Sequence, residues 1–337
     1  MKISLLGAGS WGTALGVVLA HNGHDVTIWS AVEAEVEVLS KYREHKDRLP
    51  GVILPDNISV TSDLSLACQE KELVVMSVAS PYVRSTAKQA ANYLPGDQVM
   101  VNVAKGIEEN TLLTMSQIMQ EELPGRDIAV LSGPSHAEEV SRGIPTTVVV
   151  GAKTKKTAMF VQDAFMNEVF RVYISPDMTG IEVGAALKNV IALAAGIVDG
   201  LGYGDNTKAA LITRGLAEIC RLGLAMGGEI ETFSGLSGIG DLIVTCTSKH
   251  SRNHNAGYLM GQGMTMEEAM AEVKQVVEGV YSAKAAYALA NKYQVTMPIV
   301  EQINKVLFEG QSAKEAVTEL LLRERTAEYS SLSWNES

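Results

Sequence analysis

The chain has 337 residues, about twice the roughly 150 of one ordinary domain, so its length predicts two domains. Hydrophobic residues make up 46% and charged residues 20%, a balance that excludes an intrinsically disordered chain. With 28 Lys+Arg against 39 Asp+Glu, the net charge is −11, which argues against a nucleic-acid-binding protein because such proteins carry a basic surface.

Cysteine usage and hydropathy indicate a cytoplasmic protein. The three cysteines, Cys68, Cys220 and Cys246, lie far apart and form no CxxC pair, which is typical of a reducing compartment. The first residues read as a strand that runs into glycines, so we expect no signal peptide. The longest apolar run, Val190–Val198, falls short of the roughly 20 residues that span a bilayer, so we expect no stable membrane insertion.

The first half of the chain alternates short apolar runs with helical patterns. Unbroken apolar strands that alternate with helices predict a parallel-rich sheet covered on both faces. The runs are Ile3–Leu6, Val26–Trp29, Leu73–Val78, Val99–Val103, Ile128–Leu131, Val148–Val150 and Val169–Tyr173.

A glycine-rich turn follows the first apolar run. Gly7, Gly9 and Gly12 form the G-x-G-x-x-G pattern, between that run and the helical stretch Thr13–His21. In this strand–turn–helix context the first glycine allows a tight turn and the second a close approach of the backbone to a pyrophosphate. The third lets helix and strand pack closely, and the free N–H groups of the helix start favour phosphate. The turn therefore predicts a dinucleotide site.

The end of the second strand leaves the choice of dinucleotide open. NAD-binding folds usually carry an acidic residue there, which accepts from the ribose hydroxyls. This chain has Ser30, with Glu33 three residues on, and Ser30-x-x-Glu33 also matches a capping box for the next helix. We favour the capping interpretation. Neither Asp nor Arg stands at the strand tip, so NAD and NADP both remain candidates.

Two loops follow later strands of the expected sheet. Lys105 follows Val99–Val103, and Ser132–Ala137 follows Ile128–Leu131. Ligands of open α/β sheets bind beyond the carboxyl ends of the strands. We therefore expect Lys105 to lie as a cation near the ligand and the backbone N–H groups around Ser135 to contact it.

The second half of the chain reads as helices. We therefore expect an α/β Rossmann-type N-terminal domain with a parallel-rich sheet, residues 1–177, followed by an all-α C-terminal domain, residues 178–337. The polar tail Ser330–Ser337 is expected to be mobile. The expected helices are Met178–Leu201, Lys208–Met226, His250–Met260, Met266–Glu272, Tyr281–Lys292, Ile299–Phe308 and Ala313–Arg323.

Lys188 interrupts the almost wholly apolar segment Met178–Val198. On a helix it shares a stripe with apolar and small residues, and burial there would lower its pKa and suit it to proton transfer. The alternative is a lysine whose ammonium group reaches the surface. Gly184 and Ala185 indicate open space beside the lysine, which a substrate could fill.

Asp241 ends a glycine-rich stretch of the helical half. The residue either caps the helix Leu242–Cys246 or serves as a functional carboxylate, with Thr245 one helical turn further on.

Ser251-Arg252-Asn253 stands at the start of another expected helix. A serine cap, helix-terminal N–H groups, an arginine and an amide make a candidate phosphate site, and a surface arginine beside a capping serine is the alternative. His250 and His254 are four residues apart, but no third His or Cys lies near them, so we expect no metal site.

Together these motifs resemble those of bacterial NAD(P)-dependent glycerol-3-phosphate dehydrogenases. The resemblance runs from about residue 2 to about residue 325. The motifs, in chain order, are Gly-Ala-Gly-Ser-Trp-Gly-Thr-Ala (7–14), Ala-Lys-Gly (104–106), Ser-Gly-Pro-Ser-His-Ala (132–137), Leu-Lys-Asn (187–189), Gly-Asp-Leu (240–242), Ser-Arg-Asn (251–253) and Val-Val-Glu-Gly (276–279).

The resemblance implies NAD or NADP as cofactor, and dihydroxyacetone phosphate and sn-glycerol 3-phosphate as substrate and product. It implies Lys188 as the proton donor and acceptor, with Thr245 supporting the neighbourhood of Lys188 and Asp241. Where many members of the family carry an arginine or histidine after the second strand, this chain has Ser30 and Ala31. The implied nucleotide contacts are Ser10, Trp11, Lys105, Ala137, Arg252, Val276 and Glu278, and the implied substrate contacts are Lys105, Gly133, Ser135, Lys188, Asp241, Ser251, Arg252 and Asn253.

The resemblance also implies a reaction, a hydride transfer between the nicotinamide and C2 of dihydroxyacetone phosphate in a site between the domains, for glycerophospholipid synthesis. Two alternatives remain at this point: a dehydrogenase of the same architecture that acts on a carboxylate such as ketopantoate, and a nucleotide-sensing protein without catalysis. The long apolar helix is compatible with a homodimer interface and equally with a buried core.

Overall fold

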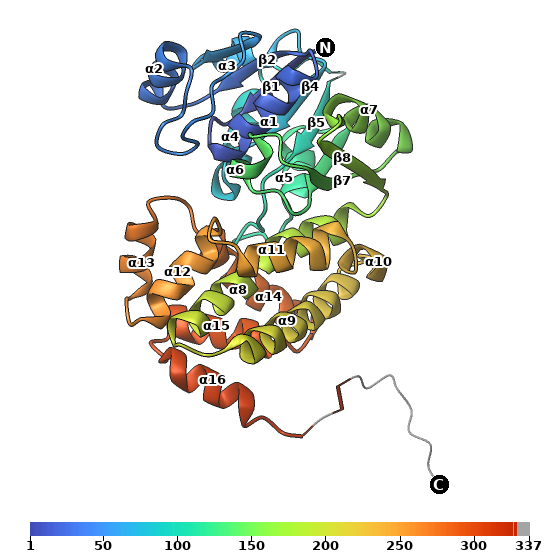
Figure 1. The fold of residues 1–337 in the computed structure, drawn as a ribbon. Helices are drawn as coiled ribbons and strands as arrows, with labels where there is room; N and C mark the ends of the chain where they lie inside the picture. The colour runs from blue at the N-terminus through green and yellow to red at the C-terminus, as the bar shows by residue number, and fades with distance from the viewer. Residues whose placement is uncertain (97, 326, 329–337) are drawn as a thin grey trace.

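A computed structural model describes residues 1–96, 98–325, 327 and 328 of the chain. A sheet with helices forms the N-terminal domain, and a bundle of helices below it forms the C-terminal domain (Figure 1). The expected α/β Rossmann-type domain followed by a helical domain is therefore confirmed. The tail Ser330–Ser337 lies outside the described residues.

Within the described residues, eight strands form one sheet in the order β3-β2-β1-β4-β5-β6-β7-β8. All neighbouring strands pair in parallel except β6 and β7, which are antiparallel. The sequence missed β3, an edge strand whose run Ile-Ser-Val-Thr buries only its first residue fully. The strands are β1 Lys2–Leu6, β2 Asp25–Trp29, β3 Ile58–Thr61, β4 Leu73–Met76, β5 Val99–Asn102, β6 Ile128–Ser132, β7 Thr146–Ala152 and β8 Phe170–Ser175.

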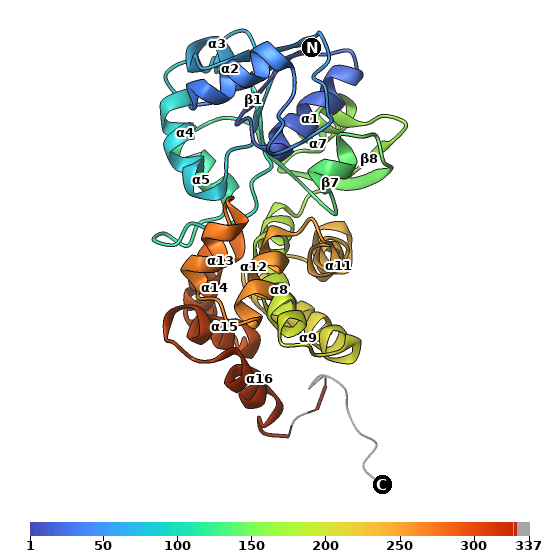
Figure 2. The ribbon, with the colours of Figure 1, turned by 60° about the vertical axis from the view of Figure 1, so that its left-hand side comes forward.

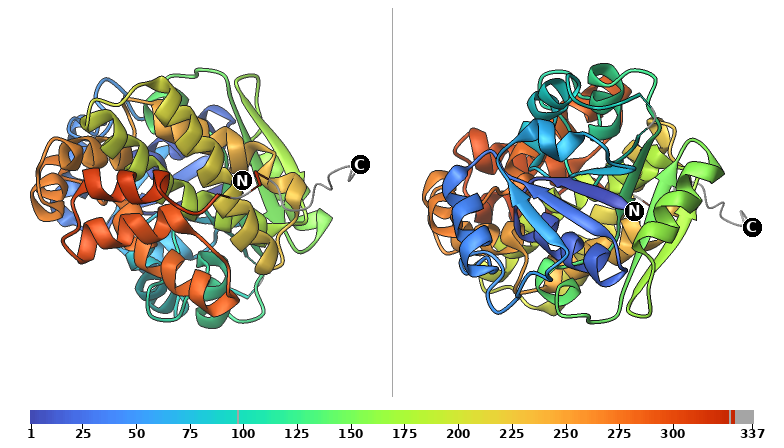
Figure 3. Two further views of the ribbon diagram at one scale, coloured as in Figure 1. Left: turned by 90° about the horizontal axis from the view of Figure 1, so that it is seen from below. Right: turned by 90° about the horizontal axis from the view of Figure 1, so that it is seen from above.

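Helices cover both faces of the sheet, as the view from above shows (Figure 3). Alternate strand residues enter two separate cores, since successive side chains of a strand point to opposite faces. Leu73 and Val75 of β4 join the core under α1, α6 and α7, whereas Val74 and Met76 join the core under α3, α4 and α5. The helices of this domain are α1 Ser10–His21, α2 Glu33–Tyr42, α3 Leu64–Cys68, η1 Ser80–Tyr82, α4 Val83–Ala90, α5 Met115–Glu122, α6 Ala137–Val140 and α7 Lys155–Phe165.

Helix α8, Met178–Gly200, is the core of the helical domain, with α9, α11, α12 and α14 packed around it (Figure 2). It is long and apolar enough to cross a membrane by composition, but it is fully buried inside the protein. The same burial leaves α8 no free face, so the idea that it forms a homodimer interface is wrong. The other helices are α9 Asp205–Ala225, α10 Ile230–Phe233, η2 Leu236–Gly240, α11 Asp241–Thr247, α12 Arg252–Gly261, α13 Met266–Val273, α14 Glu278–Tyr293, α15 Pro298–Phe308 and α16 Ala313–Leu321.

Glycines bring α12 against α8. A β-carbon at Gly196 would lie 2.0 Å from the carbonyl oxygen of His254, and one at Gly257 would lie 2.0 Å from that of Leu193. Only glycine permits this approach of the two backbones. The start of α12 is thereby held beside the middle of α8, where Lys188 lies.

Candidate active site

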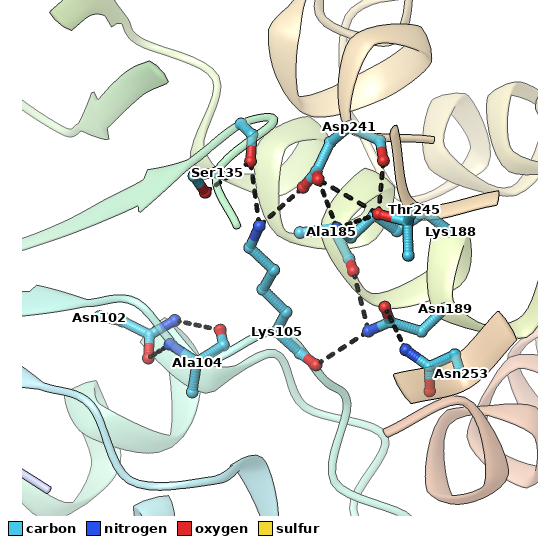
Figure 4. Close-up of polar contacts among 11 residues, drawn as sticks. Asn102, Ala104, Lys105, Ser135, Ala185, Lys188, Asn189, Asp241, Thr245 and Asn253 are labelled. Carbon is cyan, nitrogen blue, oxygen red and sulfur yellow. Dashed lines mark hydrogen bonds and ion pairs between the residues drawn. The ribbon is translucent and has the colours of Figure 1, made fainter. Parts of the chain in front are cut away.

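Asp241 lies at the centre of a buried charged cluster between the two domains (Figure 4). Lys188 Nζ donates to its Oδ1, and Lys105 Nζ donates to its Oδ2 at 2.8 Å. Burial acts to raise the pKa of Asp241, but the two ammonium groups outweigh it and lower the pKa. Asp241 is the first residue of α11 and its carboxylate makes no capping bond, so the capping alternative is wrong.

Lys188 is buried in the middle of α8, with a relative exposure of 5%. Its Nζ donates to Thr245 Oγ1 at 2.8 Å as well as to Asp241, and Thr245 Oγ1 donates to the Asp241 carbonyl oxygen at 2.6 Å. The ammonium group therefore does not reach the surface. The pKa of Lys188 is lowered to about 7: burial is the main cause, the charge of Asp241 opposes it, and the nearby charge of Lys105 adds to it.

Lys105 reaches the same carboxylate from the N-terminal domain. It follows β5 in a loop, and its Nζ also donates to the carbonyl oxygen of Gly133 at 3.1 Å. The loop is fixed at Ala104, whose carbonyl and N–H bond the Asn102 side chain at 2.9 and 3.1 Å. On the other side, Asn189 Nδ2 donates to the Lys105 carbonyl oxygen at 3.5 Å (Figure 4).

The loop after β6 brings Gly133 and Ser135 to the cluster. Gly133 has φ +140°, and a β-carbon there would lie 3.0 Å from Val148 Cα, so this turn requires glycine. Ser135 Oγ donates to the Gly133 carbonyl oxygen at 2.9 Å. Ala137, the first residue of α6, is buried.

The space expected beside Lys188 is not open at Gly184. A β-carbon at Gly184 would lie 2.7 Å from the Ser237 carbonyl oxygen, so the backbone of η2 fills that position. Gly184 is therefore a packing residue that lets η2, and with it the start of α11, approach α8.

The Ser251-Arg252-Asn253 segment begins α12. Ser251 caps the helix, since its Oγ accepts from the His254 N–H at 3.2 Å. Asn253 is buried; its Nδ2 donates to Asn189 Oδ1 at 2.9 Å. Arg252 is exposed, and its Nη1 donates to Gln275 Oε1 at 3.3 Å. The segment thus adjoins the Lys188 cluster through the Asn253–Asn189 bond, while the Arg252 side chain makes no bond to Asp241.

Val276 and Glu278 lie at the start of α14. Val276 is half-buried, and Glu278 crosses to the N-terminal domain, where it accepts from the Ser80 N–H at 3.1 Å and from the Ser80 hydroxyl. Burial raises the pKa of the Glu278 carboxyl, and the bonds from Ser80 oppose that shift. The family resemblance implies a nucleotide contact for Glu278. Ser80 was not predicted, because it stands in no local motif.

The glycine-rich turn has the geometry that its pattern predicts. Gly7 has φ +128°, and a β-carbon there would lie 2.6 Å from the Val78 nitrogen. A β-carbon at Gly12 would lie 2.2 Å from the Gly7 carbonyl oxygen. One at Gly9 would meet no described atom closer than Arg48 Nη1, at 3.9 Å, so Gly9 borders open space.

Next to this turn, the expected capping box at the end of β2 is wrong. Ser30 Oγ donates to Glu35 Oε2 at 2.5 Å and accepts from the Val32 N–H at 3.2 Å. Helix α2 begins at Glu33 without a side-chain cap. Sequence reasoning missed Glu35 because its other two partners, His45 and Arg48, come from the loop after α2, which no short pattern connects to the strand.

Comparison with known proteins agrees with this geometry. A family model described as the N-terminus of NAD-dependent glycerol-3-phosphate dehydrogenase matches residues 2–158, and one described as its C-terminus matches residues 177–318. These matches cover both domains and separate this chain from the ketopantoate-type dehydrogenases and from a nucleotide sensor without catalysis.

Individual relatives are similar over nearly the whole chain. A glycerol-3-phosphate dehydrogenase [NAD(P)+] of Agathobacter rectalis is 62% identical, with 99% of both chains covered. One of Fusobacterium nucleatum is 56% identical, with 98% of this chain and 99% of that protein covered. The crystal structure of glycerol-3-phosphate dehydrogenase from Coxiella burnetii superimposes with a TM-score of 0.93 at 35% identity, over 96% of this chain and 99% of the other. The chain belongs to the NAD-dependent glycerol-3-phosphate dehydrogenase family.

Proposed function

We propose that Lys188 is the general acid and base of the glycerol-3-phosphate dehydrogenase reaction that this chain catalyses. The observation that carries the proposal is a lysine buried on an apolar helix, bonded to Asp241 and Thr245, with a pKa of about 7. A lysine with such a pKa is present in both protonation states near neutral pH, which a group that gives and takes a proton requires. Asp241 and Thr245 fix the direction in which its ammonium group points.

The nucleotide belongs at the glycine-rich turn. Gly9 borders open space, and Trp11 Nε1 is buried without a hydrogen-bond partner among the described residues, so both fit a ligand. When bound, the nicotinamide exchanges a hydride with C2 of the substrate. Gly7 and Gly12 shape the turn, and the N–H groups at the start of α1 hold phosphate. The remaining nucleotide contacts that we propose are Ser10, Lys105, Ala137, Arg252, Val276 and Glu278.

The substrate phosphate belongs at the start of α12. Ser251, Arg252 and Asn253 supply a helix N-terminus, a guanidinium group and an amide there. Arg252 is an exposed residue, and the charge-assisted bonds that a guanidinium makes to a phosphate are strong. The other substrate contacts that we propose, Lys105, Gly133, Ser135, Lys188 and Asp241, surround the proton-transfer group.

The proton moves at Lys188 Nζ. In reduction of dihydroxyacetone phosphate, the Lys188 ammonium gives its proton to the oxygen on C2 as the carbonyl becomes a hydroxyl. In oxidation of sn-glycerol 3-phosphate, the neutral amine takes that proton back. The Lys105 ammonium group, which shares the Asp241 carboxylate with Lys188, lies beside the same oxygen and stabilises the negative charge that develops on it.

The chain divides for this reaction near residue 177, with residues 1–177 holding the nucleotide and the helical residues from 178 onward supplying Lys188 and the phosphate contacts. We place the enzyme in the cytoplasm, where three free cysteines are stable, and its product in glycerophospholipid synthesis. A homodimer would need a surface other than α8. The net charge of −11 supports a small-molecule substrate rather than nucleic acid.

Replacement of Lys188 by alanine tests the proposal. Lys188→Ala should bind NADH normally, measured by quenching of Trp fluorescence, and lose at least about 10²-fold in turnover, the usual loss for a positioned acid–base group. Lys208→Ala is the matched control, because Lys208 also pairs with an aspartate in the helical domain, Asp199, at 2.8 Å. Near-normal turnover of Lys188→Ala, or equal losses in both variants, would contradict the proposed role.

A further inference from the structure

The loop after α2 places an arginine beside the nucleotide turn, where the strand tip itself offers none. Ser10 Oγ, at the start of α1, donates to the Arg48 carbonyl oxygen at 3.0 Å. The Arg48 guanidinium lies over the open side of Gly9, with Nη1 3.9 Å from the position of a β-carbon there. The backbone of Arg48 is therefore bonded to the start of α1, and its side chain lies next to the turn at Gly9.

A buried carboxylate holds that guanidinium in place. Glu35 Oε1 lies 3.0 Å from Arg48 Nη1 and 3.4 Å from His45 Nε2, and Glu35 Oε2 accepts from Ser30 Oγ at 2.5 Å. The Glu35 side chain is 12% exposed, whereas that of Arg48 is 43% exposed. Burial acts to raise the pKa of Glu35, but bonds from His45 and Ser30 and the charge of Arg48 outweigh it, so Glu35 is ionised.

In Rossmann-type domains, the end of the second strand faces the adenosine ribose, where an acidic residue bonds the 2′-hydroxyl of NAD or an arginine accommodates the 2′-phosphate of NADP. Here the end of β2 is Ser30, and the hydroxyl of Ser30 connects directly to Glu35 and through it to Arg48. The carboxylate already has three partners, while the Arg48 side chain is 43% exposed. A 2′-phosphate that approaches from solvent would therefore contact Arg48 rather than the buried carboxylate of Glu35.

We propose that Arg48 recognises the 2′-phosphate of NADP(H), and that Glu35 holds Arg48 in position while weakening its attraction for that phosphate. The inference rests on the proposed nucleotide site at the glycine-rich turn. Because two ionised groups of opposite charge sit side by side, the chain accepts both nucleotides: Arg48 favours the phosphorylated one, and Glu35 limits that preference by repelling the phosphate.

Binding of nucleotide fragments to the full-length protein tests this without catalysis. Adenosine 2′,5′-bisphosphate and adenosine 5′-monophosphate differ only in the 2′-phosphate, and isothermal titration gives a dissociation constant for each. Arg48→Met should weaken binding of the bisphosphate about tenfold, the effect of one partly exposed charge-assisted bond, and leave binding of the monophosphate within about twofold. Glu35→Gln should have the opposite effect on the bisphosphate, with binding severalfold tighter, and should leave binding of the monophosphate unchanged.

Lys46→Met is the matched control, because it removes a positive charge from the same loop at an exposed side chain that stacks on Tyr42. It should change neither dissociation constant. Kinetics should follow the binding: with dihydroxyacetone phosphate, Arg48→Met should lower kcat/KM for NADPH about tenfold relative to NADH.

Three results would overturn the proposal. One is equal weakening of bisphosphate and monophosphate binding in Arg48→Met, which would make Arg48 a general support of the turn. Another is a Lys46→Met protein that binds the bisphosphate as weakly as Arg48→Met does. The third is a wild-type protein that binds the monophosphate as tightly as the bisphosphate. None of these results bears on Lys188, whose role is tested by turnover of Lys188→Ala, so the two proposals fail on different measurements.

Discussion

The pH dependence of the two reaction directions follows from the environment of Lys188. Burial brings the pKa of this lysine from the usual 10.5 to about 7. At pH 7 an ordinary lysine is neutral in about one molecule in 3,000, whereas Lys188 is neutral in about half. The supply of free base near neutral pH is therefore larger by about 10³-fold, and the ammonium form remains equally available.

The assay is kcat/KM for each direction between pH 5.5 and 9.5, at saturating nucleotide. Oxidation of sn-glycerol 3-phosphate needs the neutral amine, so kcat/KM should rise tenfold per pH unit below about 7 and level off above it. Reduction of dihydroxyacetone phosphate needs the ammonium, so its kcat/KM should be level below about 7 and fall above it. The two pH profiles should therefore share one inflection near pH 7, with kcat/KM rising through it for oxidation and falling through it for reduction.

A second group nearby makes a control necessary. His136 lies within electrostatic range of Lys188, and burial lowers the pKa of its imidazole below 6.5. His136→Asn should therefore keep the inflection near pH 7. Lys188→Arg should lose turnover at every pH, because a guanidinium group does not release its proton in this range. Reduction that stays level to pH 9, or an inflection that disappears with His136, would refute the assignment.

Two further predictions concern the phosphate and the fold. Arg252→Ala should raise KM for dihydroxyacetone phosphate about 10- to 100-fold but leave KM for unphosphorylated dihydroxyacetone nearly unchanged, and equal increases would remove the arginine from the phosphate site. Glu218 is buried and accepts the N–H groups of Ile299 and Val300 at 2.7 and 3.2 Å, and burial raises its pKa from 4.5 to about 7. The folded state then binds more protons than the unfolded state between these pH values, so the free energy of unfolding should fall by about 3 kcal/mol as pH rises from 4.5 to 7. Urea titration at pH 5 and pH 8 should show this fall reduced in Glu218→Gln, and the same fall in both proteins would contradict it.

Local patterns predicted the parts of the site that depend on one segment. The spacing of Gly7, Gly9 and Gly12 specifies a turn whose crowding around Gly12 is visible in the structure. Lys188 was identifiable because a single cation within an apolar helix must be either buried or extended to the surface, and its partners keep it buried. Ser251 follows the ordinary rule for helix caps.

Contacts between distant segments were outside the reach of such patterns. Ser30 has a capping-box partner at the right spacing in Glu33, yet its hydroxyl bonds Glu35, because Arg48 and His45 hold that carboxylate in place from a loop. Gly184 looked like open space from its lack of a side chain, but a glycine on a buried helix also admits a neighbouring backbone, which is its role here. In both cases the deciding partner comes from a segment that local spacing does not connect to the residue.

The position of Lys105 depends on the same helix that carries Lys188. Ile107, two residues after Lys105, packs in the core of the helical domain. Asn102, which fixes the loop through Ala104, donates to Glu182 Oε1 at 3.3 Å. The loop of the N-terminal domain is therefore attached to the helical domain on both sides of the lysine.

Glu182 makes this attachment specific. Its buried carboxylate also accepts from the Ser116 N–H at 2.8 Å and the Ser116 hydroxyl at 2.6 Å, so α8 is fixed against the start of α5 and the end of β5 at once. Lys188 follows six residues later, about 9 Å along the helix axis. A shift of α8 by one residue would move Lys188 by about 1.5 Å and break the bonds of Glu182, whose unsatisfied carboxylate would then be costly to keep buried. The carboxylate at the start of α8 thus sets the separation of the two ammonium groups that share Asp241.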